Sequence, residues 1–342
     1  MTRIYMVLNQ YVTIMISNSN HKHTVSGDDP LQSRLLSFFQ ANIEEPIKKI
    51  SLIRDQIFKI ETHQKKYAGK GFSNADSLKK QKWLTKRLHK AGFNKTYHFL
   101  KTKPEKGYLY KGKYYGILTW IEHSNPVFRF NSNENCQAGV LLLKEFHDHT
   151  KKVLSKGDSY FGSIDYYQKW VERYRQFKSN VPALQSFVPS GIIEDILKWG
   201  EKSLKNIEYR SPYEKEERVI LHGDVAHHNF IRSEKGLYLI DFDLSSIGHP
   251  IHDYLQYANR ILPFLQWDVN ELIKLPGYSQ LLEDPYFIYA ILYPTDIYRE
   301  WNRAIKHGLL GQEKTVKNLL NVTIDQYEKR LKFFNSLQNM VI

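Results

Sequence analysis

The first third of the chain alternates apolar and polar residues in the manner of β-strands. Segments 47–53 (IKKISLI) and 56–62 (QIFKIET) flank the dipeptide Arg54-Asp55, and segment 65–72 (KKYAGKGF) follows. Apolar residues at alternate positions indicate half-buried strands, and the short break between the first two indicates a β-hairpin. We therefore predict three successive strands in this part of the chain.

An amphipathic helix interrupts the strand pattern. Segment 73–93 (SNADSLKKQKWLTKRLHKAGF) begins with residues that cap helices, repeats its apolar side chains at helical spacing and ends around Gly92. Two more strands are predicted around 97–102 and 114–122. Residues 47–122 are thus expected to follow the order βββαββ.

Helical spacing dominates after Asn125-Pro126. Long helices are predicted over 136–154, 163–177, 190–204 and within 252–337. Two short apolar runs, 218–221 and 237–243, have the character of strands. We expect these two strands to pair as a hairpin that holds the loop between them.

Three regions follow from this pattern. Residues 1–46 form an extension with a polar segment (18–30) and a short helix (31–40), residues 47–123 a small β-rich lobe, and residues 124–342 a larger helical lobe. The expected fold class is α+β with two lobes, and the cleft between two lobes is a usual place for a ligand.

Composition narrows the class of protein. A chain of 342 residues that is 42% hydrophobic can bury a sizeable core, and its single cysteine, Cys136, permits no internal disulfide, which favours a reducing compartment. No apolar run approaches the roughly 18 residues of a membrane span. Polar Asn9, Gln10 and Thr13 interrupt the apolar N-terminus, so a signal peptide is not expected.

The formal charge of +13 is unevenly distributed. Residues 1–120 hold 22 Lys and Arg against 8 Asp and Glu, whereas residues 121–342 hold 27 against 28. A basic first third either attracts an anionic partner or forms a solvated surface. No zinc-finger spacing or RNA-binding aromatic signature accompanies the lysines, so a specific nucleic-acid partner is not expected.

Polar residues crowd the loop between the two short strands. LHGDVAHHNF (221–230) contains three histidines, Asp224 and Asn229, and the following apolar run leads to Asp241. Phosphoryl transfer needs a carboxylate that accepts the proton of an attacking hydroxyl and oxygen ligands that hold Mg²⁺ against the phosphates. Asp224 as the base, and Asn229 and Asp241 as oxygen ligands, meet both needs. An alternative is a metal-dependent phosphohydrolase with His222, Asp224, His252 and Asp253 as ligands, which leaves Asn229 without a role.

The same residues resemble a known family. His222, Asp224 and Asn229 are similar to the catalytic-loop signature of the aminoglycoside phosphotransferase and choline kinase superfamily, relatives of protein kinases. IDFD (240–243) resembles its metal-binding strand end, GHPIHDYLQY (248–257) its G-x-P-x-x-D segment, and LLLKEFHDHT (141–150) an early helix of its C-terminal lobe. The residue sequence of the segments HGDVAHHNF and LIDFDLSSIGHPIHDYLQYANRILPF is most similar to that of spore-coat proteins of the CotS and YutH type. The resemblance covers residues 47–335 and implies a bilobal protein-kinase-like fold.

The resemblance implies a role for each matched residue. Asp224 would be the catalytic base, Asn229 and Asp241 would bind Mg²⁺, and Asp243 would be an accessory metal ligand. Lys70 would hold the α- and β-phosphates of ATP. The backbone of a hinge at Trp120, Ile121 and Glu122 would meet the adenine, and His222 and Asp253 would support the catalytic loop.

The sequence departs from the family's pattern at four places, most of them in the nucleotide-binding half. Gln81 stands where the family has a glutamate that pairs with the lysine, so Lys70 loses a positioning partner. Arg54-Asp55 replaces a glycine-rich turn, AGKGF (68–72) is expected to be an irregular strand, and His249 replaces an aspartate. This combination suits a weak kinase or a pseudokinase.

The resulting hypothesis is a spore-coat-associated, kinase-like protein that transfers phosphate from Mg²⁺-ATP to a hydroxyl acceptor. An inactive pseudokinase scaffold of the coat is the alternative, with other coat proteins as partners and the 23 tyrosines as adhesive or helix-packing groups. Synthesis in the cytoplasm and a final place in the spore coat are expected. The segment YPTDIYREWNR (293–303) suits an acceptor that is a cationic alcohol or a protein tail.

Overall fold

The computed structural model describes residues 13–15, 30–54, 56–154, 160–208 and 218–341. By its internal contacts the chain divides into two compact units, residues 1–125 with 231–243 and residues 126–230 with 244–342. Each unit has its own core. In the described part of the chain, no helix is long and apolar enough to cross a membrane. The polar segment 18–30 lies outside the described residues except for Pro30.

The first unit is built on an antiparallel sheet of six strands in the order β1-β2-β3-β4-β6-β5. The order βββαββ predicted for residues 47–122 is therefore present, with one further strand at the N-terminal edge. The elements of this unit are β1 (Thr13–Met15), α1 (Pro30–Asn42), β2 (Lys49–Arg54), β3 (Ile57–Glu61), β4 (Lys66–Phe72), α2 (Ala75–Lys90), β5 (Tyr108–Tyr110), β6 (Lys113–Thr119), β8 (Phe230–Ser233) and β9 (Gly236–Leu239).

Helix α1 packs onto this sheet. Leu35, Phe38 and Phe39 of the helix join Ile50 and Ile60 of the sheet in one hydrophobic core. Burying such side chains contributes roughly 1.5–3 kcal/mol each. The helix that we placed in a separate extension is therefore an integral part of the first unit.

The prediction of an irregular strand beside Lys70 was wrong. β4 pairs with β3 from Ile57↔Lys70 to Glu61↔Lys66 without a shift, and its pairing with β6 is equally regular. The glycines serve packing, because a Cβ at Gly69 would lie 2.5 Å from the ring of Phe39.

The fourth strand of the predicted order lies further along the chain than expected. Segment 97–102 makes only one isolated bridge, Phe99↔Leu118. The strand that pairs with β6 over several residues is β5, with Tyr108 opposite Tyr115. Segment 97–102 nevertheless lies beside β6, because the N–H of Leu100 donates to the carbonyl of Ile117 and the N–H of Thr119 to the carbonyl of His98, both at 2.8 Å.

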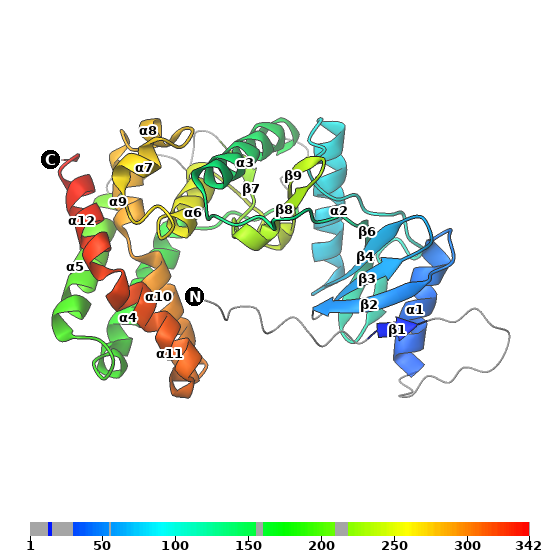
Figure 1. Ribbon diagram of the computed structural model, residues 1–342, viewed down its shortest axis with the longest axis horizontal. Helices are drawn as coiled ribbons and strands as arrows, with labels where there is room; N and C mark the ends of the chain where they lie inside the picture. Colours follow the sequence, from blue (N-terminus) through cyan, green and yellow to red (C-terminus); the bar gives the residue numbers. More distant parts are fainter. Residues whose placement is uncertain (1–12, 16–29, 55, 155–159, 209–217, 342) are drawn as a thin grey trace. The chain divides into compact units, whose positions relative to one another are not determined.

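The second unit is mainly helical, as predicted. α4 packs against α5 and α10, and α5 also packs against α9 (Figure 1). Its elements are α3 (Asn133–Val153), α4 (Tyr166–Leu184), α5 (Ser190–Glu208), β7 (Val219–Leu221), β10 (Ser246–Gly248), α6 (Ile251–Ile261), α7 (Val269–Ile273), α8 (Tyr278–Leu281), α9 (Pro285–Leu292), α10 (Thr295–Lys306), α11 (Glu313–Leu320) and α12 (Tyr327–Gln338).

The hairpin predicted around the polar loop was also wrong. β7 pairs with β10, and β9 pairs with β8, a strand that follows the loop directly. The two apolar runs on either side of the loop therefore belong to different two-stranded sheets. Their short strands have the composition expected of any buried strand, so composition alone could not assign their partners.

Candidate active site

The loop after β7 is held from within the second unit by a buried aspartate. Asp253 accepts hydrogen bonds from the backbone N–H groups of His222 (2.7 Å) and Gly223 (3.0 Å) and lies 2.9 Å from Nε2 of His147. Burial alone would raise the pKa of Asp253, but the contact with His147 and the bond from His222 outweigh it and hold that pKa below its ordinary value. An ionised Asp253 thus fixes the start of the loop.

Gly223 is required by the path of this loop. Its φ is +79°, and a Cβ there would lie 2.4 Å from the carbonyl oxygen of Leu244. Any other residue would combine an unfavourable backbone conformation with a clash against backbone. The glycine therefore determines where the next residue, Asp224, can lie.

Asp224 is partly exposed and is held by its own loop. Nδ2 of Asn229 donates to the backbone oxygen of Asp224 (2.8 Å) and lies 3.4 Å from its carboxylate oxygen Oδ2. Nη2 of Arg260 lies 3.4 Å from the other carboxylate oxygen. Asn229 is buried, and its Oδ1 has no hydrogen-bond partner among the described residues. A buried acceptor without a partner is costly, which marks Oδ1 as a position where a ligand atom would be stabilising.

A second group of predicted site residues lies in the first unit. Nζ of Lys70 donates to Oδ1 of Asp241 (2.8 Å) and lies 3.2 Å from Oδ2 of Asp243. Burial opposes ionisation of Asp241, but Lys70 overcomes it and holds the pKa of Asp241 below its ordinary value. Burial and the neighbouring Asp241 raise the pKa of Asp243. Lys70 thus lies between two carboxylates whose pKa values are shifted in opposite directions.

Gln81 joins this cluster through Asp243. Its Nε2 donates to Oδ1 of Asp243, and its Oε1 accepts from the hydroxyl of Tyr97 (2.7 Å). Gln81 is fully buried, so both ends of its amide are satisfied by protein groups. The residue that replaces the expected glutamate therefore acts on the carboxylate beside Lys70, and the lysine does not lack anionic partners.

The backbone at Asp241 is unusual. Its φ is +71°, in the left-handed region that residues other than glycine rarely adopt. Such a conformation costs roughly 1–3 kcal/mol and is often found at functional sites. Arg54, from the turn without glycines, also reaches this residue, with Nη2 3.7 Å from Oδ2.

The segment expected to be a hinge follows β6 directly. The N–H of Trp120 donates to the carbonyl of Lys66 (3.2 Å), which extends the β4–β6 ladder by one residue. Glu122 forms an ion pair with the side chain of Lys66. Since the N–H of Trp120 is already bonded, the backbone of Ile121 and Glu122 offers the better candidate groups for a nucleotide.

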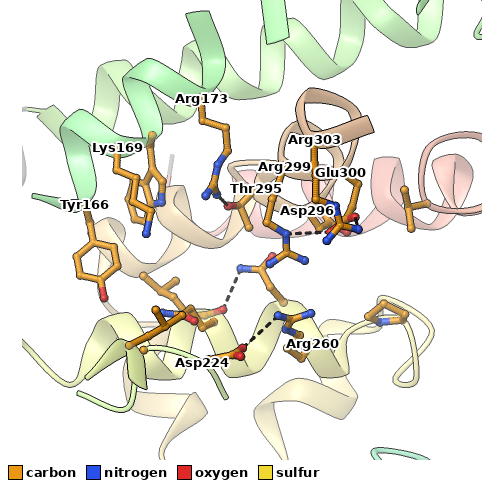
Figure 2. A pocket seen from close by; sticks show the side chains of 18 of the residues that line it. Tyr166, Lys169, Arg173, Asp224, Arg260, Thr295, Asp296, Arg299, Glu300 and Arg303 are labelled. Atoms are coloured by element: carbon orange, nitrogen blue, oxygen red, sulfur yellow. Dashed lines mark hydrogen bonds and ion pairs between the residues drawn. The ribbon is translucent and has the colours of Figure 1, made fainter. Parts of the chain in front are cut away.

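The second unit contains a cavity of about 830 Å³ next to Asp224. Arg260, Lys169, Arg173 and Arg299 extend into it from three helices, α6, α4 and α10 (Figure 2). Drug-sized ligands bind in cavities of roughly 300–1,000 Å³, so this space is large enough for a small acceptor.

The residues of the phosphohydrolase alternative have other partners. The ring of His252 stacks on Tyr166 at a centroid distance of 3.9 Å, and burial lowers the pKa of His252 to about 4. Asp253 is occupied by the bonds to the loop. Within the described ranges, no group of three or more His, Cys, Asp or Glu is placed to hold a metal ion.

Comparison with known proteins agrees with the kinase-like architecture of a small antiparallel sheet region and a mostly helical region. The sequence pattern of the phosphotransferase enzyme family matches residues 74–270, more than half of the chain. The chain therefore belongs to this family. Comparison with curated proteins gives no match.

Solved structures show the same fold. An aminoglycoside phosphotransferase from Alicyclobacillus acidocaldarius superposes with a TM-score of 0.71 at 15% identity, covering 95% of this chain and 98% of that chain. A spectinomycin phosphotransferase in complex with ADP and spectinomycin gives 0.60 at 15% identity, with 90% and 98% covered. The GDP complex of an aminoglycoside 2'-phosphotransferase gives 0.60 at 13% identity, with 89% and 99% covered.

Three residues near the candidate site, His147, Lys169 and Arg173, were not predicted from the sequence. His147 lies within a segment quoted for its family resemblance, but its contact with Asp253 depends on the packing of α3. Lys169 and Arg173 are four residues apart and thus share a face of α4. That spacing was a usable signal, although a charged helix face is ordinarily solvated.

Proposed function

We propose that this protein transfers a phosphoryl group from Mg²⁺-ATP to a hydroxyl group of an acceptor bound in the cavity beside Asp224. Asp224 would accept the proton of the attacking hydroxyl. Asn229 and Asp241 would bind the metal ion, with Asp243 as accessory ligand. Lys70 would bind the phosphates, and the backbone around Ile121 would meet the adenine.

The observation that carries this proposal is the state of Asn229. Its amide nitrogen holds Asp224, while its buried Oδ1 faces no protein donor in the described part of the chain. A buried carbonyl oxygen of this kind is the type of ligand that Mg²⁺ accepts. The left-handed backbone of Asp241 supports the same assignment, because backbone strain of this kind is often found at functional sites.

The donor set fits a magnesium ion. The candidate ligands, Asn229, Asp241 and Asp243, offer only oxygen atoms, and a hard cation prefers carboxylate and amide oxygens. When bound, the ion would neutralise charge on the phosphates. The protein's own contribution is to orient the acceptor, to hold Asp224 through Asn229, and to supply Lys70 to the phosphates.

The first test is the thermal stability of the purified protein with millimolar ATP, with and without Mg²⁺. A ligand that binds only the folded state raises the melting temperature, and saturation at 100 times Kd stabilises by about 2.7 kcal/mol. We expect a rise that requires the metal. No rise at all would contradict the proposal and favour the pseudokinase alternative.

Two variants separate metal binding from proton transfer. Asp241→Asn removes a charged ligand at constant volume, so we expect it to lose the Mg²⁺-dependent rise. Asp224→Asn should retain that rise and lose phosphotransfer by a factor of roughly 10²–10⁴, the usual contribution of a general base. Asp148→Asn, at an exposed position of α3, is the matched control and should change neither.

We also propose that this activity serves the spore coat. The support is the resemblance of residues 219–265 to coat proteins of the CotS and YutH type. A fluorescent fusion expressed in a sporulating host should accumulate at the forming spore. Uniform fluorescence in the mother cell throughout sporulation would contradict this role and leave the phosphotransfer proposal untouched.

A further inference from the structure

The cavity beside Asp224 has a marked excess of positive charge. Lys169, Arg173, Arg260, Arg299 and Arg303 are the five Lys and Arg side chains that line it, against three acidic side chains, Asp224, Asp296 and Glu300. The three acids are already paired. Glu300 contacts Arg299 and Arg303, Asp296 contacts Arg330 outside the cavity lining, and Asp224 contacts Arg260.

Two cations remain without an acidic partner among the described residues. The ammonium group of Lys169 lies 5.7 Å from the ring centroid of Tyr166, and Arg173 donates to the hydroxyl of Thr295. Figure 2 shows both side chains extending from α4, across the cavity from Asp224 and Arg260. A charged group that reached them would therefore share the cavity with the proposed base.

The cations also repel one another. Partial burial, followed by Arg173 and Arg299, lowers the pKa of Lys169. Burial and Arg299 lower the pKa of Arg173, with Tyr293 and Glu300 acting in the opposite direction. Cations held together without counter-charges destabilise one another, and a bound anion would remove this repulsion.

We infer that the acceptor is an anionic hydroxyl compound whose phosphate or carboxylate group is bound by Lys169 and Arg173 while its hydroxyl faces Asp224. This inference rests on the proposed function, because it names the acceptor class of that site. Of the two acceptors considered from the sequence, a cationic alcohol and a protein tail, it disfavours the first, since a cation would meet two positive side chains that have no acidic partner among the described residues.

The test uses three probes that share one sugar ring, namely glucose 6-phosphate, glucose and glucosamine, titrated calorimetrically into the full-length protein. We expect glucose 6-phosphate to bind at least ~10-fold more tightly than glucose, which corresponds to about 1.4 kcal/mol, and glucosamine no more tightly than glucose. The preference should weaken as salt is added, because partly exposed charges are screened.

Variants on a single helix localise the effect. Arg173→Ala and Lys169→Ala should each remove most of the preference. Arg175→Ala is the matched control, because Arg175 is an exposed arginine on the same helix that does not line the cavity. Among the described residues the ammonium group of Lys169 makes only a ring contact, so Lys169→Ala still tests the inference if Arg173→Ala fails to fold. Lys169→Glu should shift the preference toward glucosamine.

Three outcomes would overturn the inference. The first is that glucose 6-phosphate binds no more tightly than glucose, or that neither sugar binds measurably. Arg175→Ala could remove the preference as fully as Arg173→Ala. The cavity variants could abolish the Mg²⁺-ATP melting shift, which would assign these cations to the nucleotide. A wild-type protein with the sugar-phosphate preference but without a Mg²⁺-ATP shift would instead contradict the proposed function alone.

Discussion

At the scale of single residues, Gln81 decides how the lysine cluster is charged. Its amide donates to Asp243 and accepts from Tyr97, so a neutral side chain supports a carboxylate that in turn contacts Lys70. A glutamate at this position would add a third carboxylate beside Asp241 and Asp243. The absence of the family's glutamate is therefore compatible with a positioned Lys70.

The substitution Gln81→Glu should lower stability at pH 7 by roughly 1–3 kcal/mol, because a donor to Asp243 is replaced by a like charge in a buried place. The carboxyl pair formed by the new glutamate and Asp243 would have a pKa in the folded protein above its value in the unfolded chain. Its penalty is therefore greatest above that pKa and shrinks as the pH falls through it. Urea unfolding at pH 7 and at pH 5 measures this, with the exposed Gln176→Glu as control. Equal stability of variant and parent at pH 7 would contradict the contact.

Whether a contact between two site residues could be predicted depends on how far apart they lie in the sequence. Asp224 and Asn229 lie in one short loop, so their association could be predicted from their spacing. Lys70 and Asp241 are 171 residues apart, and only the resemblance paired them with one site. The contact between Gln81 and Asp243 depends on packing of α2 that no local pattern encodes.

At the scale of elements, close helix contacts are set by glycines opposite tyrosines. Gly200 of α5 faces Tyr298 of α10, whose hydroxyl donates to the carbonyl of Ile196 (2.6 Å). A Cβ at Gly200 would lie 2.1 Å from that hydroxyl oxygen. The helices can approach this closely only because position 200 lacks a side chain.

Gly200→Ala is therefore expected to destabilise the protein by roughly 1–3 kcal/mol through overpacking, although alanine favours a helix. The measurement is the shift of the melting temperature. Gly191→Ala on the same helix is the control, because no atom lies within 4 Å of its built Cβ. Combining Gly200→Ala with Tyr298→Phe removes the clashing oxygen and should recover part of the loss; an unchanged penalty would contradict this account.

The order of elements was more predictable than the pairing of strands. Helices such as α3 and α5 have long periodic faces, and their positions were predicted within a few residues, whereas α4 extends seven residues beyond its predicted end. β7 and β9 have three and four residues, too few to encode a partner. The partner of such a strand depends on how it packs against the surrounding helices, and these contacts form between segments that are distant in the sequence.

At the scale of the whole molecule, the net charge of a segment does not indicate the charge of a cavity within it. Residues 121–342 hold 27 basic and 28 acidic residues, yet they contain the cationic cavity. The fold achieves this by pairing the acids near the cavity, while Lys169 and Arg173 have no acidic partner in the described part of the chain. Composition by segment therefore could not reveal the charge of the site.

The tyrosines allow a test of the scaffold alternative. Tyr257, Tyr278, Tyr293 and Tyr298 are fully buried, and burial raises the pKa of Tyr278 and Tyr298 well above its ordinary value. These groups favour folding below the unfolded value of about 10, and this contribution is lost as pH rises above it. In a phenolate absorbance titration we expect one fraction to ionise near pH 10 and the rest only on unfolding. A single reversible step for all tyrosines would contradict helix packing.

Helix α4 has two stretches with separate duties. Lys169 and Arg173 line the cavity in its first half, and Phe177 and Leu184 lie fully buried in its second half. Exchanging the two cations would alter which molecules enter without touching the residues that hold the helix in place. The range of molecules that the cavity admits can therefore diverge through two codons, while selection for folding acts further along the same helix.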